Sequence, residues 1–263
     1  NRFNAMKENV SNLAHETVFE VRNVTSRDRK KVRDISFSVC RGEILGFAGL
    51  VGSGRTELMN CLFGVDKRAG GEIRLNGKDI SPRSPLDAVK KGMAYITESR
   101  RDNGFFPNFS IAQNMAISRS LKDGGYKGAM GLFHEVDEQR TAENQRELLA
   151  LKCHSVNQNI TELSGGNQQK VLISKWLCCC PEVIIFDEPT RGIDVGAKAE
   201  IYKVMRQLAD DGKVILMVSS ELPEIITVCD RIAVFCEGRL TQILTNRDDM
   251  SEEEIMAWAL PQE

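Results

Sequence analysis

The chain of 263 residues is 41% hydrophobic and 27% charged, with a formal net charge of −2. These proportions are typical of a globular protein with a substantial core, and the near-neutral charge excludes a surface that gathers nucleic acid or anionic lipid by electrostatics. The 8 cysteines show no C-x-x-C spacing, so reduced thiols are expected rather than a zinc site or a disulfide scaffold. No apolar run is long enough to span a membrane. Because the chain starts at Asn1 and not at methionine, we expect it to be a piece of a longer protein.

The first hundred residues predict mainly strands. Residues 1–15 are polar and aperiodic, and predict a linker or tail. The basic run Arg27–Lys31 predicts a solvated hairpin tip. A helix is predicted at residues 56–63, with its C-terminal cap at Gly64. Strands are predicted where hydrophobic residues alternate or run together, at residues 18–24, 35–40, 43–49, 72–77 and 93–97.

The pattern changes in the middle of the chain. From Glu98 to Ser164 strand patterns stop, and helices are predicted at residues 111–121 and 135–151. A further helix is predicted to carry Cys180 on its apolar stripe and to end at Pro181. Strands at 183–187, 213–220 and 231–238 then alternate with helices, the last of which opens with a capping box at Ser251 and Glu254. Such alternation predicts an α/β fold with a largely parallel sheet covered on both faces.

The strand at 43–49 leads into a glycine loop, "GLVGSGRT". The loop fits the phosphate-binding pattern G-x-x-x-x-G-K-[ST] except that Arg55 replaces lysine. Glycines at 49, 52 and 54 let the backbone turn tightly and direct its N–H groups at an anion, so we assign phosphate binding to Gly49, Gly52, Ser53, Gly54, Arg55 and Thr56. Thr56 is also placed to bind Mg²⁺. A plain glycine-rich turn is the alternative interpretation.

Two later motifs carry further chemistry. In "VIIFDEPT", Asp187 can hold Mg²⁺ and Glu188 can polarise an attacking water, because both follow a buried strand at the carboxyl edge of the sheet. The alternative is a strand followed by an acidic loop. In "LSGGNQQK", Ser164, Gly165 and Gly166 begin a helix and can grip a γ-phosphate. The alternative is a simple N-cap by Ser164.

These motifs, in this order, resemble the nucleotide-binding domain of ABC transporters over nearly everything after residue 16. The signature "LSGGNQQK" with "EPTRGIDVGAK" is most similar to the second ATPase half of bacterial monosaccharide importers, D-allose importers among them. The resemblance implies a P-loop NTPase fold with an antiparallel β edge, a RecA-like core at about 16–97 and 165–263, and a helical subdomain at about 98–164. It also implies two ATP molecules with Mg²⁺, each held between one domain's glycine loop and the other domain's signature.

The resemblance carries further expectations. Gln168 joins the signature, Glu98 occupies the family's Q-loop position, Asp194 the D-loop, and Ser220 the position of a catalytic switch histidine. The implied partners are an N-terminal ATPase half of the same chain, membrane permease subunits and, indirectly, a periplasmic sugar-binding protein. The implied location is the cytoplasmic face of the bacterial inner membrane, with no nucleic acid partner.

The departures from the family pattern predict an unequal pair of sites. Arg55 replaces lysine, Glu98 replaces glutamine, Ser220 replaces histidine, and the aromatic that stacks on adenine is missing before Val32. Each change weakens the site on this chain's own loop, whereas Asp187, Glu188 and the signature are intact. We therefore expect an ATPase half that couples ATP hydrolysis to sugar uptake mainly through the partner's site. The alternatives are a non-catalytic, nucleotide-gated structural module and an ABC-type ATPase acting on DNA or ribosomes, for which neither a long coiled-coil insert nor a basic face is present.

Overall fold

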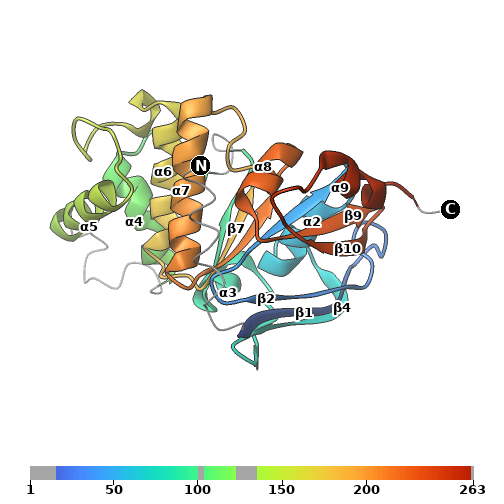
Figure 1. Ribbon diagram of the computed structural model, residues 1–263. Coiled ribbons are helices and arrows are strands. Elements are labelled where there is room, and N and C mark those ends of the chain that lie inside the picture. The colour runs from blue at the N-terminus through green and yellow to red at the C-terminus, as the bar shows by residue number, and fades with distance from the viewer. Residues whose placement is uncertain (1–15, 100–103, 123–134, 262–263) are drawn as a thin grey trace.

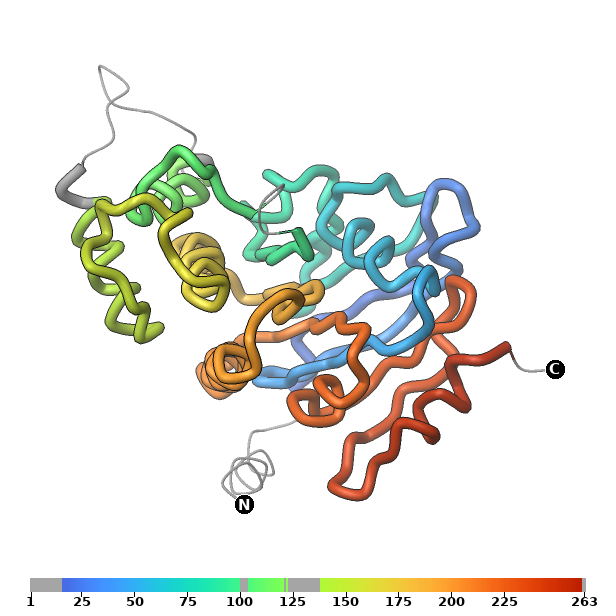
Figure 2. The backbone as a smooth tube through the Cα atoms, turned by 90° about the horizontal axis from the view of Figure 1, so that it is seen from above, coloured from blue at the N-terminus to red at the C-terminus, as the bar shows by residue number. Residues whose placement is uncertain are grey.

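The computed structural model describes residues 16–99, 104–122 and 135–261, so the predicted tail at 1–15 lies outside the described residues. Two lobes are apparent in Figure 1 and Figure 2, one containing both sheets and the other made of helices. The helical lobe contains α4 (Ile111–Lys122), α5 (Glu135–Leu148) and α6 (Gly165–Leu177). Among the described helices, none is long and apolar enough to cross a bilayer.

The larger sheet has six strands in the order β10-β9-β3-β8-β7-β6. All its neighbours pair in parallel except β10, which pairs antiparallel with β9 at one edge. Its strands are β3 (Ile44–Gly49), β6 (Met93–Ile96), β7 (Val183–Asp187), β8 (Val214–Val218), β9 (Arg231–Cys236) and β10 (Arg239–Thr245). Because parallel strands end at one edge, the residues that follow β3, β6, β7 and β8 are brought close together. This arrangement confirms the predicted α/β fold with a largely parallel sheet.

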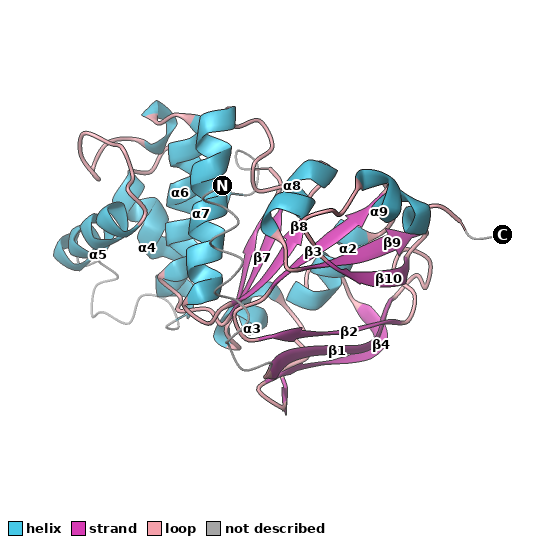
Figure 3. Cartoon of the chain, viewed as in Figure 1, coloured by secondary structure: helices cyan, strands magenta, loops and turns pink. Residues whose placement is uncertain are grey.

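A second, antiparallel sheet lies below the first in Figure 3, in the order β2-β1-β4-β5. It consists of β1 (Thr17–Ser26), β2 (Ile35–Cys40), β4 (Arg68–Leu75) and β5 (Lys78–Asp79). An Asn-Gly turn joins β4 to β5, with Asn76 and Gly77 both at positive φ, as this type of hairpin turn requires. The basic tip Arg27–Lys31 between β1 and β2 is exposed, as predicted.

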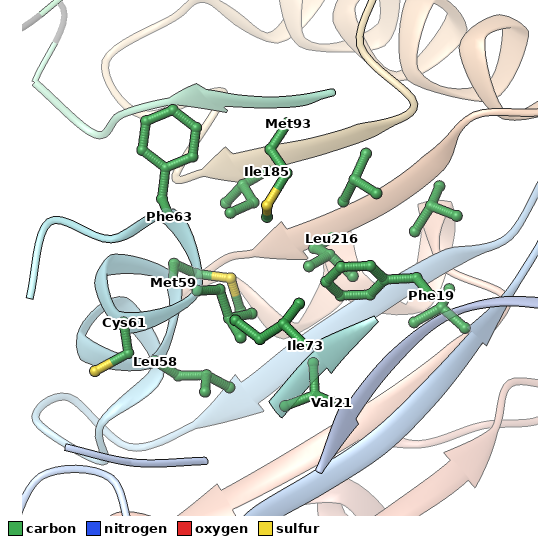
Figure 4. Close-up of a cluster of buried hydrophobic side chains, with 14 of the residues drawn as sticks. Phe19, Val21, Leu58, Met59, Cys61, Phe63, Ile73, Met93, Ile185 and Leu216 are labelled. Atoms are coloured by element: carbon green, nitrogen blue, oxygen red, sulfur yellow. The ribbon is translucent and has the colours of Figure 1, made fainter. Parts of the chain in front are cut away.

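The larger sheet buries a different hydrophobic core on each face. Along β7, Ile185 points into the core shared with the antiparallel sheet and α2 (Arg55–Phe63), whereas Ile184 and Phe186 point to the opposite face. Figure 4 shows the first core, where Met59 and Phe63 of α2 lie among side chains from both sheets. The second core is covered by α7 (Val195–Asp210), α8 (Leu222–Val228) and α9 (Glu252–Ala259). Burial on both faces explains why these strands are continuously apolar.

The helical lobe has a core of its own. Ile111 and Met115 of α4 pack with Val171 and Leu172 of α6 and with Ala142 of α5. No regular strand occurs among the described residues between Glu98 and Ser164, only an isolated bridge between Ser110 and Asn159. The predicted helices are therefore present, while the subdomain boundaries at 98 and 164 stay a prediction.

The end of α6 differs from the sequence-based expectation. The helix ends at Leu177, and Cys180 is exposed with φ of 47° rather than lying on the apolar stripe. The N–H groups of Cys179 and Cys180 donate to Trp176 O and Leu177 O, at 2.9 and 2.8 Å, which closes a tight turn before Pro181.

The predicted capping box of α9 is half formed. Ser251 Oγ accepts from the backbone N–H of Glu254 at 3.2 Å, while the Glu254 carboxylate pairs with Arg247.

Lys175 is a buried cation within α6, and it predicts a pH effect on stability. Its Nζ donates to Gly104 O at 2.5 Å, and burial lowers the pKa of Lys175 to about 8 from 10.5. The ammonium therefore destabilises the fold by about 3 kcal/mol below pH 8, and this penalty disappears as the pH rises to 10.5. Relative to Lys175→Met, the wild-type free energy of unfolding should rise across that window.

Urea unfolding of wild type and Lys175→Met at several pH values measures this difference directly. Using the difference between the two proteins removes the contribution of every other titrating group. A difference that stays constant between pH 8 and pH 10.5 would contradict the lowered pKa of Lys175.

Candidate nucleotide site

The glycine loop between β3 and α2 is held by close backbone contacts. Gly54 has φ of 104°, and a Cβ there would lie 2.2 Å from Lys31 O. Gly49 has φ of 151°, and a Cβ there would lie 2.5 Å from Phe235 O. Both positions therefore require glycine for fit as well as for conformation. Gly52 is also at positive φ, but nothing lies within 4 Å of where its Cβ would be.

The loop offers groups that fit a nucleotide phosphate. It leads directly into the N-terminus of α2, whose first N–H groups favour an anion. The Ser53 hydroxyl is buried and has no hydrogen-bond partner within the described part of the chain. An orphaned buried hydroxyl in a glycine loop matches the donors that a phosphate requires.

Asp187 lies at the carboxyl end of β7, directly beside the loop. Its Oδ1 accepts from Thr56 Oγ1 at 3.3 Å and its Oδ2 from the Tyr95 hydroxyl at 2.9 Å. Burial raises the pKa of Asp187, and the hydrogen bonds from Tyr95 and Thr56 oppose that shift. A hydroxyl and a carboxylate this close supply the hard oxygen ligands that Mg²⁺ prefers. The structure thus brings together the two residues predicted to bind the metal.

Arg55 does not extend freely into the loop. The residue is 7% exposed, and its Nη1 donates to Ser219 O at 2.6 Å, directly after β8. Burial lowers the pKa of Arg55, whereas the nearby Glu188 and Asp187 carboxylates raise it. The arginine therefore connects the glycine loop to the next strand end, in addition to placing positive charge beside the two acids.

Glu188 and Ser220 meet at the same edge. Ser220 Oγ donates to Glu188 Oε2 at 3.2 Å, and Glu188 has φ of 50°, in the left-handed region. Burial raises the pKa of Glu188, while the bond from Ser220 and the charge of Arg55 lower it. A partly desolvated carboxylate is suited to accept a proton from water, because burial raises its pKa. The left-handed backbone at Glu188 is a strained conformation of the kind found at functional sites.

Glu98 follows β6 and has a partner that the sequence did not reveal. Its carboxylate forms an ion pair with Arg191, and both side chains are exposed. The pair shows that a cation from the loop after β7 accompanies this carboxylate.

The signature residues lie in the other lobe, at the start of α6, apart from the glycine loop on α2 (Figure 1). Ser164 occupies the N-cap position, but its hydroxyl makes no capping bond and instead accepts from Asn167 Nδ2 at 3.0 Å. Gly165 follows it as the first helical residue. Gln168 Nε2 donates to Ile160 O at 3.3 Å. Ser164 is therefore the N-cap residue of α6, as the alternative interpretation expected, but its side chain does not cap the helix.

Gly166 of the signature and Asp194 at the D-loop position both contact Ala197 on α7. A Cβ on Gly166 would lie 2.6 Å from Ala197 Cβ, so this glycine allows α6 and α7 to pack closely. Asp194 caps α7, because its Oδ1 accepts from Ala197 N–H at 2.9 Å. The signature helix and the D-loop position are thus fixed against each other through Ala197.

Sequence reasoning missed several residues that shape the site. Tyr95 orients Asp187, and its signal was a hydroxyl in an otherwise apolar strand that ends at the sheet edge. Arg191 lies inside a motif that was recognised. The buried residues Thr190 and Glu224 form a group with the partly buried Lys198 behind the site. Their contacts join different elements, so sequence spacing gave no signal for them.

Comparisons with known proteins show which family this chain resembles. A family model described as "ABC transporter" matches residues 32–191. The ribose import ATP-binding protein RbsA of Lactococcus lactis subsp. cremoris is 46% identical over 244 residues, covering 93% of this chain and 48% of that protein. The galactose/methyl galactoside import ATP-binding protein MglA of Clostridium tetani is 43% identical over 248 residues, covering 94% and 48%. The chain spans about half the length of these curated relatives.

Solved structures share the fold. A nucleotide-free ATP-binding cassette from an ABC transporter superposes with a TM-score of 0.79 at 20% identity, covering 94% of this chain and 100% of that one. A cassette in a dimeric post-hydrolysis state, bound to ADP and Pi, gives a TM-score of 0.72 at 20% identity, covering 87% and 99%. These likenesses confirm the predicted P-loop NTPase fold with a RecA-like core.

Proposed function

Because this chain belongs to the ABC transporter family, we propose that it is one ATPase half of a bacterial monosaccharide importer and couples ATP hydrolysis to sugar uptake. The observation that carries the proposal is the Thr56–Asp187 pair, 3.3 Å apart and directly beside the glycine loop. The printed names of its relatives, which import ribose or galactose and methyl galactoside, support the sugar assignment. The coverage of about half of each relative supports a second ATPase half in the whole protein.

On this proposal, the described residues have distinct roles toward ATP. Gly52, Ser53 and Gly54 bind its phosphates, and Thr56 with Asp187 would hold Mg²⁺, which neutralises phosphate charge. Glu188 accepts a proton from the attacking water, with its carboxylate oriented by Ser220 Oγ at 3.2 Å. Tyr95 keeps Asp187 aligned toward Thr56.

We further propose that this chain's own site is the weaker of two. Ser220 supplies a short hydroxyl where the family has histidine, and the Glu98 carboxylate is occupied by Arg191. The planar guanidinium of Arg55 does not replace the compact ammonium of the family's lysine. The signature residues Ser164, Gly165, Gly166 and Gln168, with Asp194, then serve the site built on the partner's loop.

The proposed partners follow from that arrangement. They are an N-terminal ATPase half of the same chain, membrane permease subunits that dock on the helical lobe, and a periplasmic sugar-binding protein indirectly. The proposed place is the cytoplasmic face of the inner membrane, and D-allose is the proposed cargo. Residues 98–164 form the proposed helical subdomain between the two parts of a RecA-like core.

A non-catalytic, nucleotide-gated structural module is the second candidate. The replacement of lysine by Arg55 and the Glu98–Arg191 pair favour it, because neither position keeps the residue type that the family uses in the reaction. The Glu188–Ser220 bond speaks against it, since a proton acceptor is present and oriented.

Nucleotide binding and turnover, measured separately, test the proposal. Calorimetric titration of the chain with ATP should show binding that weakens when Mg²⁺ is removed and when Asp187 is changed to Asn. Phosphate release by the whole protein, with both ATPase halves, should then be observed and stimulated by its permease. Mg²⁺-dependent binding without any turnover would favour the structural module, and absence of binding would contradict both candidates.

A further inference from the structure

A buried carboxylate outside the recognised motifs lies behind the nucleotide site. Glu224, on α8, is 5% exposed. Thr190 Oγ1 lies 2.7 and 2.8 Å from its two oxygens, Ser219 Oγ donates to it at 2.9 Å, and Lys198 Nζ donates at 2.8 Å. We call these four residues the Glu224 cluster. Its members join the loop after β7, the end of β8, α7 and α8.

Two members of the Glu224 cluster are directly linked to residues of the candidate nucleotide site. Ser219 donates its hydroxyl to Glu224, and its carbonyl accepts from Arg55 Nη1 at 2.6 Å. Thr190 lies two residues after Glu188. Ser220, which follows Ser219, bonds Glu188 at 3.2 Å. The carboxylate of Glu224 therefore joins two loops. One follows β8 and accepts the hydrogen bond from Arg55, and the other follows β7 and carries Glu188.

The third member reaches toward the interface residues. Lys198 lies in the first turn of α7, where its backbone N–H donates to Asp194 O at 3.0 Å. The neighbouring Ala197 is capped by Asp194 and packs against Gly166 of the signature helix. The Glu224 cluster thus connects the edge that holds Arg55 to the start of α7 through a single side chain.

The charge of Glu224 is stabilised where it lies. Burial alone would raise the pKa of Glu224, but hydrogen bonds from Lys198, Thr190, Tyr202 and Ser219 lower it below its ordinary value. An ionised carboxylate accepts all of these bonds at once. An amide has a single acceptor oxygen and adds two donors, so it cannot satisfy the same set of partners.

We propose that Glu224 is a positioning residue of the nucleotide site, acting through Ser219 on Arg55. It holds the Ser219 carbonyl in the position where this oxygen accepts the hydrogen bond from the Arg55 guanidinium. Through Thr190, it also fixes the loop that carries Glu188 relative to that carbonyl. The inference rests on the proposed function, since it concerns the same site. It assigns to Glu224 an effect on nucleotide affinity that depends on the presence of Arg55.

Titration of the 263-residue chain with MgADP tests this dependence. Glu224→Gln should weaken binding by about tenfold, on the scale of one hydrogen bond to a charged group. Glu221→Gln is the matched control, because Glu221 also pairs with Lys198, at 2.7 Å, but is 55% exposed. Removing that exposed pair should change the dissociation constant by less than about threefold.

The decisive measurement repeats both variants in an Arg55→Ala background. If Glu224 acts through Arg55, Glu224→Gln should weaken MgADP binding no further there, giving a non-additive cycle. An equal loss in both backgrounds, or no loss with Arg55 present, would overturn the inference. If Glu224→Gln does not fold by thermal melting, Ser219→Ala tests the same link, with a loss of several-fold expected only when Arg55 is present. Absence of MgADP binding by the wild type would remove the proposed function itself, and the inference with it.

Discussion

Replacing Ser164 by arginine in the whole protein is expected to stop both ATP hydrolysis and sugar uptake, whereas Arg55→Ala should lower turnover by about tenfold or less. Ser164 is the N-cap residue of the signature helix, and we propose that the start of this helix receives the phosphate of the partner's nucleotide. A long cationic side chain there blocks closure over the partner's nucleotide. In the proposed division of roles, Arg55 serves only the site that lacks the family's histidine and glutamine.

The structure makes Ser164→Arg a clean test. Ser164 is exposed, and its hydroxyl bonds Asn167 Nδ2 at 3.0 Å without capping the helix, so the arginine can extend into solvent without being buried. Ser164→Ala is the matched control, because it removes the hydroxyl but adds neither bulk nor charge, and it should retain more activity than Ser164→Arg. Arg55 is buried, so the folding of Arg55→Ala needs a melting curve. If Arg55→Ala abolishes turnover while Ser164→Arg leaves it nearly intact, the two roles are reversed.

Much of the sheet could be predicted from the sequence because its strands are buried on both faces and read as continuous apolar runs. Three elements were missed for physical reasons. The edge strand β10 is only half-buried, so its hydrophobic pattern is weak. The helix α3 (Pro85–Lys90) has six residues, too few for a helical period, although Ser84 caps it. The strand β5 has two residues.

In the candidate site, too, residues defined by local sequence could be predicted and residues held by non-local contacts could not. The glycine loop, Asp187 and Glu188 are predictable because local spacing and a strand end define them. The ion pair of Glu98 with Arg191 is not, since it joins loops after two different strands. Glu224 is also not predictable, because it lies 34 residues from Thr190 and no motif connects them. Sequence identifies the groups that carry the chemistry, while non-local contacts determine how they are held.

The 263-residue chain alone is expected to release phosphate at a rate near background, even at high protein concentration. Each of its copies could pair only with another copy, so both composite sites would use the weakened loop. In each, Arg55 replaces the family's lysine, Glu98 is paired with Arg191, and Ser220 stands where the family has histidine. Intact signatures cannot compensate, because they act on a nucleotide that these loops hold poorly.

Phosphate release measured over a range of protein concentrations, with Glu188→Gln as the blank, tests this expectation. A rate that matches the blank at every concentration is the expected result. Adding the N-terminal ATPase half should raise the rate well above the blank, because its loop then receives this chain's signature. That rise should be lost with Ser164→Arg and kept with Glu188→Gln, if Ser164 serves the partner's loop and Glu188 this chain's own, as we propose. Robust, cooperative hydrolysis by the chain alone, abolished by Glu188→Gln, would show that its own loop forms a competent site and would refute the unequal pair.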